Sequence, residues 1–508
     1  MGRFNSQPHI VTAFYYISMN NTDTIAAIAT PKGTGGIAVI RISGPSAFDV
    51  GEKIFRHKNK KYKFFADIPP NTAVFGDVVN IAGDKTIDTG IAVKFAAPNS
   101  YTGEDTVEIS CHGGIYITTA VLSAAINAGA RLAGPGEFTK TAYINGKISL
   151  TGAEAVGRLI SAANEPGARL ASAQSKGGLS KKIGEISGKI KDIISEVYVF
   201  IDYPGEDLTD MTPDVMLEKL ILIKNELEIL KETYNIGRII SDGINCAIIG
   251  KPNSGKSTLL NMLSKNDVAI VHDTPGTTRD IVWSRINIGG FALNLYDTAG
   301  LRTSRDEIES IGIKKAAAKI EECGLIIGVF DISEYAGQGF CSCRREDCNI
   351  LEILKREQNN GKKIIAVLNK CDVPVGNGFN RPEYFGTQMQ SERINAFPAL
   401  TISAKNNTVL NSDTLAYDAF AQCLDDIYKL GEYDLDSGEI LTEERQYFEI
   451  CAACGNINSA ISALENGFTQ DMAGLDLELA AKNLDRCDSK SVSEDIVGRI
   501  FKNFCVGK

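Results

Sequence analysis

Short hydrophobic runs rich in β-branched residues alternate with glycine-rich turns over residues 22–145. Runs such as IAVIRISG, TAVFGDVVN and EDTVEISCHGG have the length and composition of strands, because branched side chains pack well on a pleated surface. The stretch that follows, YITTAVLSAAINAG, is typical of a helix. The pattern predicts a compact α+β domain at 22–145.

The hydrophobic period changes to that of helices at 146–240 and again at 415–508. Apolar residues three and four positions apart share one face of a helix, which then packs against a core. A polar segment, DYPGEDLTDMTPD, separates two of these helices. We expect the two stretches to form one helical domain. The predicted core positions are Ile183, Ile186, Ile190, Ile193, Ile194, Val197, Leu220, Ile223, Leu227, Leu230, Tyr234, Tyr447, Ile450, Cys454, Ile457, Ile461 and Leu464.

Residues 241–414 show a third pattern, in which short apolar strands alternate with helical stretches. The strands NCAIIG, FALNLYD, GLIIGVF, KIIAVLNK and FPALTIS indicate a parallel sheet with crossover helices on both faces. This block is predicted to be inserted into the helical domain, which is tolerated because domain termini usually lie close together. The predicted fold class is therefore multidomain α/β plus α.

Composition restricts the class of protein further. A chain of 508 residues is too long for one core, and about three domains are expected. The longest apolar run, CGLIIGVF, is far below the roughly 18 residues that span a bilayer, so we expect no stable membrane association. The net charge of −10 argues against a broad basic nucleic-acid face but leaves a local basic patch possible.

Twelve cysteines without a secretory signal indicate reduced thiols and a cytoplasmic protein. Cys341, Cys343 and Cys348 cluster in CSCRREDC, but their spacing is not a standard zinc pattern and a fourth ligand is missing nearby. We favour a surface loop over a metal site there. Residues 1–21, which contain a second methionine at Met19, are interpreted as a disordered extension or as a start codon assigned too early.

The segment GKPNSGKS at 250–257 fits the pattern G-x-x-x-x-G-K-[ST], with the strand NCAIIG before it and the helix TLLNMLS after it. In this context the backbone N–H groups of the loop surround phosphates, and the helix N-terminus adds its positive dipole end. Lys256 is predicted to reach the β- and γ-phosphates, and the Ser257 hydroxyl to bind Mg²⁺. The motif predicts a nucleoside triphosphate site.

Three further fragments, LYDTAG, VLNKCD and ISAK, follow in the order and at the separations of the GTPase superfamily. Asp297 is placed to hold Mg²⁺ through water, and the N–H of Gly300 can sense a γ-phosphate. The carboxylate of Asp372 can accept both N1–H and N2–H₂ of guanine, and adenine offers no such pair of donors. ISAK supplies a backbone N–H for the guanine carbonyl. The four fragments predict GTP rather than ATP.

The segment AIVHDTPGTTRD is the expected first switch, with Thr278 as γ-phosphate sensor and second protein ligand of Mg²⁺, although a mobile polar loop would have the same composition. Ras-like enzymes carry a water-orienting glutamine where this chain has Leu301. Glu307 and Glu309 are the nearby replacements, and no arginine finger is evident apart from Arg279. The predicted GTP-binding set is Asn253, Ser254, Gly255, Lys256, Ser257, Thr258, His272, Asp273, Thr274, Pro275, Gly276, Thr277, Thr278, Asp297, Thr298, Ala299, Gly300, Asn369, Lys370, Asp372, Ser403, Ala404 and Lys405.

These residues resemble the tRNA modification GTPases of the MnmE (TrmE) type. The resemblance rests on ATPKGTGGIAVIRISG, PNSYTGEDTVEISCHGG, PGEFTKTAYINGK, the GTPase block with GTTRD and DTAGLR, and the terminal FCVGK. It covers the chain from about Asp23 to Lys508, with Val506 in place of the usual isoleucine. It implies an N-terminal tetrahydrofolate-binding domain, a discontinuous helical domain and an inserted G domain.

The resemblance also implies a homodimer whose G domains meet across their nucleotide sites, with K⁺ in place of an arginine finger. By position, Asn253, His272, Thr274 and Thr277 would bind K⁺, mainly through backbone oxygens of the loop. The family usually has a small hydroxyl residue where this chain has His272. Glu309 matches the glutamate that orients the hydrolytic water, so the implied catalytic groups of GTP hydrolysis are Glu309 and Lys256.

In the N-terminal domain, Arg41, Glu108 and Lys147, together with the terminal Lys508, match family contacts to 5-formyl-tetrahydrofolate or a related tetrahydrofolate. The tail CVGK is not a prenylation signal, because glycine stands third and lysine last. Two interpretations of Cys505 stay open: a buried structural thiol, or a catalytic thiolate of the modification chemistry beside Lys508.

The implied function is a K⁺- and Mg²⁺-dependent GTPase that acts on tRNA with an FAD-dependent subunit of the MnmG (GidA) type, in a heterotetramer. FAD would sit on that partner and not on this chain. The pair would install an aminomethyl or carboxymethylaminomethyl group at C5 of the wobble uridine. Two alternatives remain: a ribosome-assembly GTPase, which ordinarily carries a basic RNA-binding module, and a scaffold that binds GTP without hydrolysing it.

Overall fold

The structure is a computed structural model that describes residues 23–31, 33–82, 85–202, 212–264, 284–296, 320–335, 345–373, 397–488, 494–502, 504 and 506–507. The chain divides into two compact units. Unit 1 comprises Met1–Gly157 and Asp485–Lys508, and unit 2 comprises Arg158–Leu484. Within the described residues, none of the helices is both long and apolar enough to cross a membrane.

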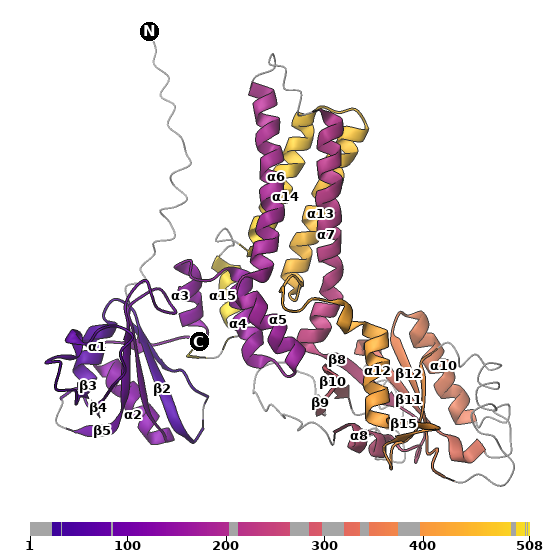
Figure 1. The fold of residues 1–508 in the computed structure, drawn as a ribbon, viewed down its shortest axis with the longest axis horizontal. Coiled ribbons are helices and arrows are strands. Elements are labelled where there is room, and N and C mark those ends of the chain that lie inside the picture. Colours follow the sequence, from indigo (N-terminus) through magenta and orange to yellow (C-terminus); the bar gives the residue numbers. More distant parts are fainter. Residues whose placement is uncertain are drawn as a thin grey trace, which may run out of the picture. The chain divides into compact units, whose positions relative to one another are not determined.

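A seven-stranded sheet forms the centre of unit 1, with strand order β3-β4-β5-β6-β2-β1-β7. Neighbouring strands are antiparallel except β1 and β7, which pair in parallel. Two helices, α1 and α2, share a hydrophobic core with the sheet (Figure 1). The elements are β1 (Ile25–Ile28), β2 (Gly35–Ser43), α1 (Ala47–Ile54), β3 (Phe55–His57), β4 (Val74–Val79), β5 (Thr86–Phe95), β6 (Thr106–Gly113), α2 (Ile115–Asn127) and β7 (Arg131–Leu132).

Strand alternation decides which side chains of this sheet leave the core. Ile40 and Ile42 of β2 and Ile109 of β6 are completely buried in the core that contains α1 and α2. Successive side chains of a strand point to opposite faces, so Arg41 and Glu108 lie on the other face. The register pairs Arg41 directly with Glu108 across β2 and β6.

The end of the chain also belongs to unit 1, together with α3 (Glu137–Ile144), the first part of α4 (Leu150–Ser161) and α15 (Glu494–Lys502). Phe501 of α15 packs in a small core with α3 and α4. Beyond α15, Val506 forms an isolated antiparallel bridge with Pro135. Gly507 has a φ of 101°, and a Cβ there would lie 2.2 Å from the carbonyl oxygen of Ile28, so only glycine fits this approach to β1.

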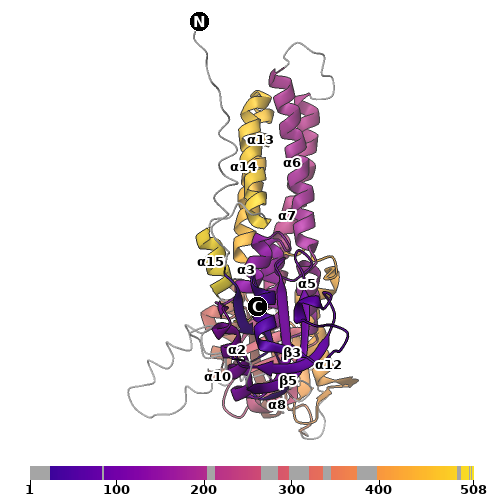
Figure 2. The same cartoon turned by 90° about the vertical axis from the view of Figure 1, so that its left-hand side faces the viewer.

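Four long helices form a bundle in unit 2, and Figures 1 and 2 both show them side by side. The predicted hydrophobic stripes face its core, and of their members only Ile194, Tyr234 and Tyr447 are half-buried rather than buried. Tyr234 stacks on Tyr447 with ring centroids 4.5 Å apart. The helices are α6 (Gly178–Asp202), α7 (Pro213–Asp242), α13 (Glu444–Glu465) and α14 (Gln470–Asp488), preceded by α5 (Glu165–Ser175).

The rest of unit 2 is an eight-stranded sheet with order β15-β14-β13-β12-β11-β8-β10-β9. Its five central strands, β13, β12, β11, β8 and β10, are parallel, and hydrophobic clusters cover both faces. The multidomain α/β plus α fold class is confirmed. The elements are β8 (Ile244–Ile249), α8 (Lys256–Ser264), β9 (Ser284–Ile288), β10 (Phe291–Tyr296), β11 (Leu325–Asp331), α10 (Arg345–Asn359), β12 (Lys363–Asn369), β13 (Ala399–Ser403), β14 (Thr408–Val409), β15 (Ser412–Leu415) and α12 (Ala416–Tyr428).

Candidate functional site

A tight loop joins the carboxyl end of β8 to the first turn of α8. Asn253 and Gly255 have φ angles of 62° and 96°, the left-handed conformation that turns successive N–H groups toward one side. A Cβ on Gly255 would lie 2.0 Å from Nδ2 of Asn369, and one on Gly250 would lie 2.5 Å from the carbonyl oxygen of Val329. The loop therefore needs glycine at both positions, and its shape suits the binding of phosphates.

The predicted phosphate-binding side chains stand at the start of α8. Lys256 Nζ donates to the carbonyl oxygens of Gly250 and Lys251 at 2.7 and 2.6 Å, so the side chain lies back along the loop. Ser257 and Thr258 follow in the first turn and are exposed. An ammonium over the loop and a hydroxyl at a helix N-terminus are the groups that bind a phosphate and its Mg²⁺.

Asn369, at the end of β12, connects the two ends of the predicted nucleotide site. Its Nδ2 donates to the carbonyl oxygen of Ser254 at 3.0 Å, and its Oδ1 accepts from the backbone N–H of Ala404 at 3.0 Å. Ser403 is fully buried, and its Oγ accepts from the N–H of Asn406 at 3.2 Å. The structure thus brings together three predicted parts of the nucleotide site. They are the phosphate loop between β8 and α8 (residues 250–255), the NKCD segment (369–372) and the ISAK segment (402–405).

Lys370 and Asp372, which follow Asn369, differ in their environment: Lys370 is paired with a carboxylate and Asp372 is exposed to solvent. Lys370, at φ 69°, forms an ion pair of 2.5 Å with Asp331, the last residue of β11. Burial by itself raises the pKa of Asp331, but hydrogen bonds from Lys370 and Ser333 outweigh it and hold the pKa below the ordinary value. Asp372, the carboxylate predicted to bind guanine, is exposed.

A buried ion pair fixes the outer side of the phosphate loop. Lys251 Nζ lies 2.9 Å from Asp347 Oδ2, near the start of α10, and the two side chains are 4% and 0% exposed. Transfer of both charges from water is costly, and the attraction between the two charges offsets part of that cost. Sequence reasoning missed this pair, because Lys251 occupies a variable position of the motif and Asp347 stands 96 residues away.

A second polar site lies on the face of the unit 1 sheet opposite α1 and α2. Arg41 Nε and Nη2 approach Glu108 Oε1 at 2.8 and 2.7 Å, and among the described residues Oε2 accepts no hydrogen bond. The Arg41 guanidinium also lies 5.2 Å from the ring centroid of Tyr101 and 5.6 Å from that of Phe138. Lys147 Nζ donates to the carbonyl oxygen of Pro98 at 2.9 Å rather than joining the Arg41–Glu108 pair.

Several predicted site residues lie outside the described residues, so their positions stay predictions. Within the described part of the chain, His, Cys, Asp and Glu form no group of three that could hold a metal ion, and the nine cysteines there are free thiols. Of the cysteine cluster, Cys348 is half-buried on α10. The predicted residues outside the description are His272, Asp273, Thr274, Pro275, Gly276, Thr277, Thr278, Arg279, Asp297, Thr298, Ala299, Gly300, Leu301, Glu307, Glu309, Cys341, Cys343, Cys505 and Lys508.

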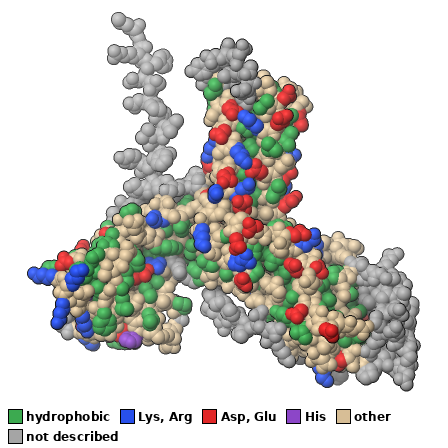
Figure 3. Space-filling view, in the orientation of Figure 1, with side chains coloured by type: hydrophobic (Ala, Val, Ile, Leu, Met, Phe, Trp, Pro, Cys, Tyr) green, Lys and Arg blue, Asp and Glu red, His purple; other side chains and the backbone are tan. Residues whose placement is uncertain are grey.

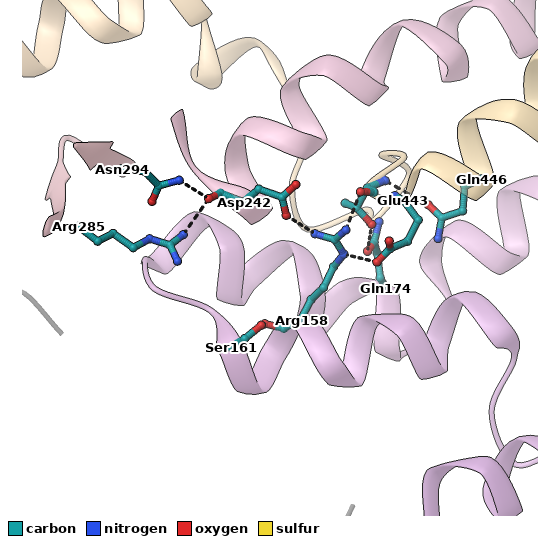
Figure 4. Close-up of polar contacts among 9 residues, drawn as sticks. Arg158, Ser161, Gln174, Asp242, Arg285, Asn294, Glu443 and Gln446 are labelled. Atoms are coloured by element: carbon teal, nitrogen blue, oxygen red, sulfur yellow. Dashed lines mark hydrogen bonds and ion pairs between the residues drawn. The ribbon is translucent and has the colours of Figure 1, made fainter. Parts of the chain in front are cut away.

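An arginine network lies where the helices of unit 2 meet its sheet (Figure 4). Arg158 Nε donates to Glu443 Oε1 at 2.7 Å, Nη1 to Asp242 Oδ1 at 3.3 Å, and Nη2 to the carbonyl oxygen of Thr442 at 2.7 Å. Burial alone lowers the pKa of Arg158, but the two carboxylates raise it above its ordinary value. One guanidinium therefore ties α4 to the end of α7 and to the start of α13.

The backbone of Asp242 connects this arginine network to the sheet of unit 2. Its carbonyl oxygen accepts hydrogen bonds from Asn294 Nδ2 at 3.0 Å and from Arg285 Nη2 at 3.3 Å, on β10 and β9 (Figure 4). Burial lowers the pKa of Arg285. The sequence analysis did not identify this network, since its members are spread from residue 158 to residue 443.

Two family models match the chain. The one described as GTP-binding protein TrmE N-terminus matches residues 24–147, and the one described as MnmE helical domain matches residues 150–505. The tRNA modification GTPase MnmE of Acetivibrio thermocellus is 36% identical over 490 residues, which are 96% of this chain and 100% of that protein. Proteins of the same name from Thermoanaerobacter sp. (strain X514) and Clostridioides difficile (strain 630) are 36% and 35% identical, each over 96% of this chain and 99% of their own.

A search of solved structures matches the G domain of the T. maritima FeoB iron transporter at 19% identity, over 37% of this chain and 98% of that one. Its TM-score is 0.23, which gives that likeness no weight.

Proposed function

The chain belongs to the family of tRNA modification GTPases of the MnmE type, and we propose that it hydrolyses GTP as part of modifying tRNA. The observation that carries this proposal is the bridge made by Asn369, which bonds to Ser254 of the phosphate loop and to Ala404 of ISAK. Such a bridge holds the phosphate-binding and base-binding segments in one geometry, so a single guanine nucleotide can contact both.

The phosphate end of the site binds and orients GTP. Loop N–H groups and Lys256 would hold the β- and γ-phosphates, and Ser257 with Thr278 would hold Mg²⁺. Asn253 fits a cation ligand, because it is exposed and its side chain makes no hydrogen bond to any described residue. K⁺ at Asn253 and the positions His272, Thr274 and Thr277 supplies positive charge when bound, while Glu309 orients the attacking water.

Phosphate release from GTP in KCl and in NaCl tests this mechanism on the purified chain. We expect much faster turnover in KCl than in NaCl, and loss of that difference in Asn253→Ala. Equal rates in both salts would remove K⁺ from the proposal. An absence of turnover in either salt would instead support a scaffold that binds GTP without hydrolysing it.

The base end of the site would recognise guanine through Asp372, with Ser403, Ala404 and Lys405 completing the pocket. Two observations support this role. Asp372 is exposed, and it lies three residues after Asn369, whose side chain is held by the phosphate loop. The aliphatic part of Lys370 would lie along the base, with its ammonium oriented by Asp331. Competition of GTP, ATP and XTP for a fluorescent guanine nucleotide measures the specificity directly, and ATP that competes as well as GTP would refute it.

The one-carbon chemistry would take place at the Arg41–Glu108 pair of unit 1. Oε2 of Glu108, which accepts no hydrogen bond from the described residues, suits a pterin N–H donor, and Lys147 and Lys508 would face the remainder of 5-formyl-tetrahydrofolate. The chain's last residues return to the same unit through Val506 and Gly507, which supports the inclusion of Lys508 and Cys505. Calorimetric titration should show weaker tetrahydrofolate binding to Glu108→Gln, and unchanged binding would refute this assignment.

Together with an FAD-dependent subunit of the MnmG type, a homodimer of this chain would modify C5 of the wobble uridine in a heterotetramer. Mass spectrometry of tRNA nucleosides from a deletion strain tests this step. We expect loss of the modified wobble nucleoside. Unchanged nucleosides, with the protein cosedimenting with ribosomal subunits, would favour a ribosome-assembly GTPase.

Cys505 is proposed to act as a thiolate in that modification. We expect Cys505→Ser to retain GTP hydrolysis and to lose the modified nucleoside in a complementation strain. Normal modification in that strain would leave Cys505 as a structural thiol.

A further inference from the structure

A strongly basic segment follows the first helix of unit 1. In KIFRHKNKKYK, residues 53–63, six of eleven residues are lysine or arginine and none is acidic, although the whole chain carries a net charge of −10. The segment contains β3, which lies at the edge of the sheet and, among the described strands, pairs with β4 alone. The blue side chains gather at this end of unit 1 in Figure 3, where Figure 1 labels β3 and β4.

The lysines of the segment are exposed and mostly lack acidic partners. Lys58 forms an ion pair of 2.6 Å with Asp77. Lys60, Lys61 and Lys63 are exposed, and the described residues place no carboxylate within ion-pair distance of them. Uncompensated cations this close together create a local positive potential that attracts a polyanion.

The acidic residues that flank the segment in the sequence, Glu52 and Asp67, accept hydrogen bonds from the backbone instead. Glu52 Oε2 accepts from the N–H of Ala66 at 2.9 Å, and Asp67 Oδ2 accepts from the N–H of Phe64 at 2.9 Å. Both carboxylates therefore order the turn that presents the lysines, rather than pairing with Lys60, Lys61 or Lys63.

Exposed aromatic rings accompany these cations. Phe64 is 50% exposed and Phe75 of β4 is 53% exposed. Lys63 Nζ lies 5.1 Å from the ring centroid of Phe64, and Lys58 Nζ lies 5.3 Å from that of Phe75. Lysines that contact phosphates beside rings on which unpaired bases stack are the combination by which proteins hold single-stranded RNA.

We propose that Lys58, Lys60, Lys61, Lys63, Phe64 and Phe75 form an RNA-binding surface that holds the tRNA substrate, the lysines on phosphates and the rings against unpaired bases. This inference rests on the proposed tRNA-modifying function and assigns part of the substrate contact to this chain. Only β4 and β5 separate β3 from β6, which carries Glu108. At about 4.8 Å between strands, β3 lies roughly 14 Å from β6.

The test is binding of fluorescently labelled tRNA to the full chain, measured by anisotropy in salt from about 50 to 200 mM. The variant is Lys60→Gln, Lys61→Gln and Lys63→Gln together. The matched control replaces the exposed Lys181, Lys191 and Lys482 of unit 2 with glutamine, which changes the net charge equally. A third variant, Phe64→Ala, removes a ring and leaves every charge in place.

We expect the triple variant to bind at least about tenfold more weakly near 0.1 M salt, with the slope of log K against log salt reduced by two to three. The control should bind like the wild type. Phe64→Ala should bind more weakly with the slope unchanged, because stacking releases no counterions. All variants should hydrolyse GTP at the wild-type rate.

Wild-type affinity in the triple variant, an equal loss in the control, or no binding of tRNA to the wild-type chain would overturn the inference. A variant that keeps tRNA binding but loses binding to vesicles of anionic lipid or to polyglutamate would assign the surface to another partner and overturn it too. If the deletion strain nevertheless lacks the modified wobble nucleoside, only the surface assignment fails and the proposed function stands.

Discussion

Replacement of Lys251 with methionine leaves the carboxylate of Asp347 buried without the ammonium that neutralises it. The two groups are 2.9 Å apart, with side chains 4% and 0% exposed, so water cannot take the place of either. Removal of one partner from such a pair costs roughly 3–5 kcal/mol, whereas replacement of both by uncharged groups is often nearly neutral. We therefore expect Lys251→Met and Asp347→Asn each to destabilise the G domain strongly, and the double variant to recover most of the loss.

The chain's single tryptophan, Trp283, directly precedes β9 in the sequence, so its fluorescence reports on unfolding of this domain. With a urea slope of about 2 kcal/mol per M, a loss of 3–5 kcal/mol lowers the unfolding midpoint by roughly 2 M. Lys363→Met, at an exposed lysine that begins β12, controls for the loss of a positive charge.

The affinity for a fluorescent GDP analogue should fall with the midpoint in the single variants, because Lys251 is part of the phosphate loop, and should return in the double variant. A single substitution that costs less than about 1 kcal/mol would refute the argument, since that is the effect expected of a solvated surface pair. A double variant no more stable than the singles would show that packing, and not the uncompensated charge, causes the loss.

Three shorter predictions test other parts of unit 2. Asp372→Asn should weaken GTP binding roughly 100-fold, as two charge-assisted hydrogen bonds are lost, and should favour XTP over GTP in nucleotide competition. Because the pKa of Asp331 is held below its ordinary value of 3.8, its ion pair with Lys370 should stabilise the G domain fully above pH 3.8 and progressively less as the pH falls below it. The urea midpoints of the wild type and Asp331→Asn should accordingly differ at pH 6, and the difference should shrink as the pH falls below 3.8; an unchanged difference would contradict the assignment. Arg158→Ala should lower the melting temperature of unit 2, and Arg158→Lys should restore it only in part, because an ammonium cannot reproduce the three directed bonds of the guanidinium; full rescue by lysine would show that charge alone matters.

The helices, strands and phosphate loop could be predicted from the sequence because each depends mainly on residues close together in the chain. Ile190 and Leu227 are buried where the helical period places them, since a 3.6-residue repeat puts them on the core face whatever their partners are. The phosphate loop and its flanking strand and helix were likewise predicted, because the motif combines strand, turn and helix signals within a few residues. Alternation along β2 and β6 is equally local, and it explains why Arg41 and Glu108 share a face.

Contacts between distant segments carry no such signal. Arg158 and Glu443 are 285 positions apart, and neither residue stands out from the charged face of a helix in the sequence. The return of Val506 to Pro135 depends on the packing of α15 with α3 and α4, which hydrophobic period alone does not specify. A carboxylate at the end of the apolar run LIIGVF is unusual enough to single out Asp331 in the sequence. Its pairing with Lys370 could not be predicted, because it depends on β11 and β12 being neighbours in the sheet.

Gly243 is the only residue between α7, which ends at Asp242, and β8, which begins at Ile244. Its φ is 83°, and a Cβ there would lie 2.7 Å from the carbonyl oxygen of Ala292, so the chain turns sharply with no slack. The thirty residues of α7 extend about 45 Å at 1.5 Å per residue. A rotation of ten degrees at this pivot would sweep the far end of the helix through about 8 Å. A small tilt of α7 relative to the sheet would therefore move the far end of the helix by several ångströms.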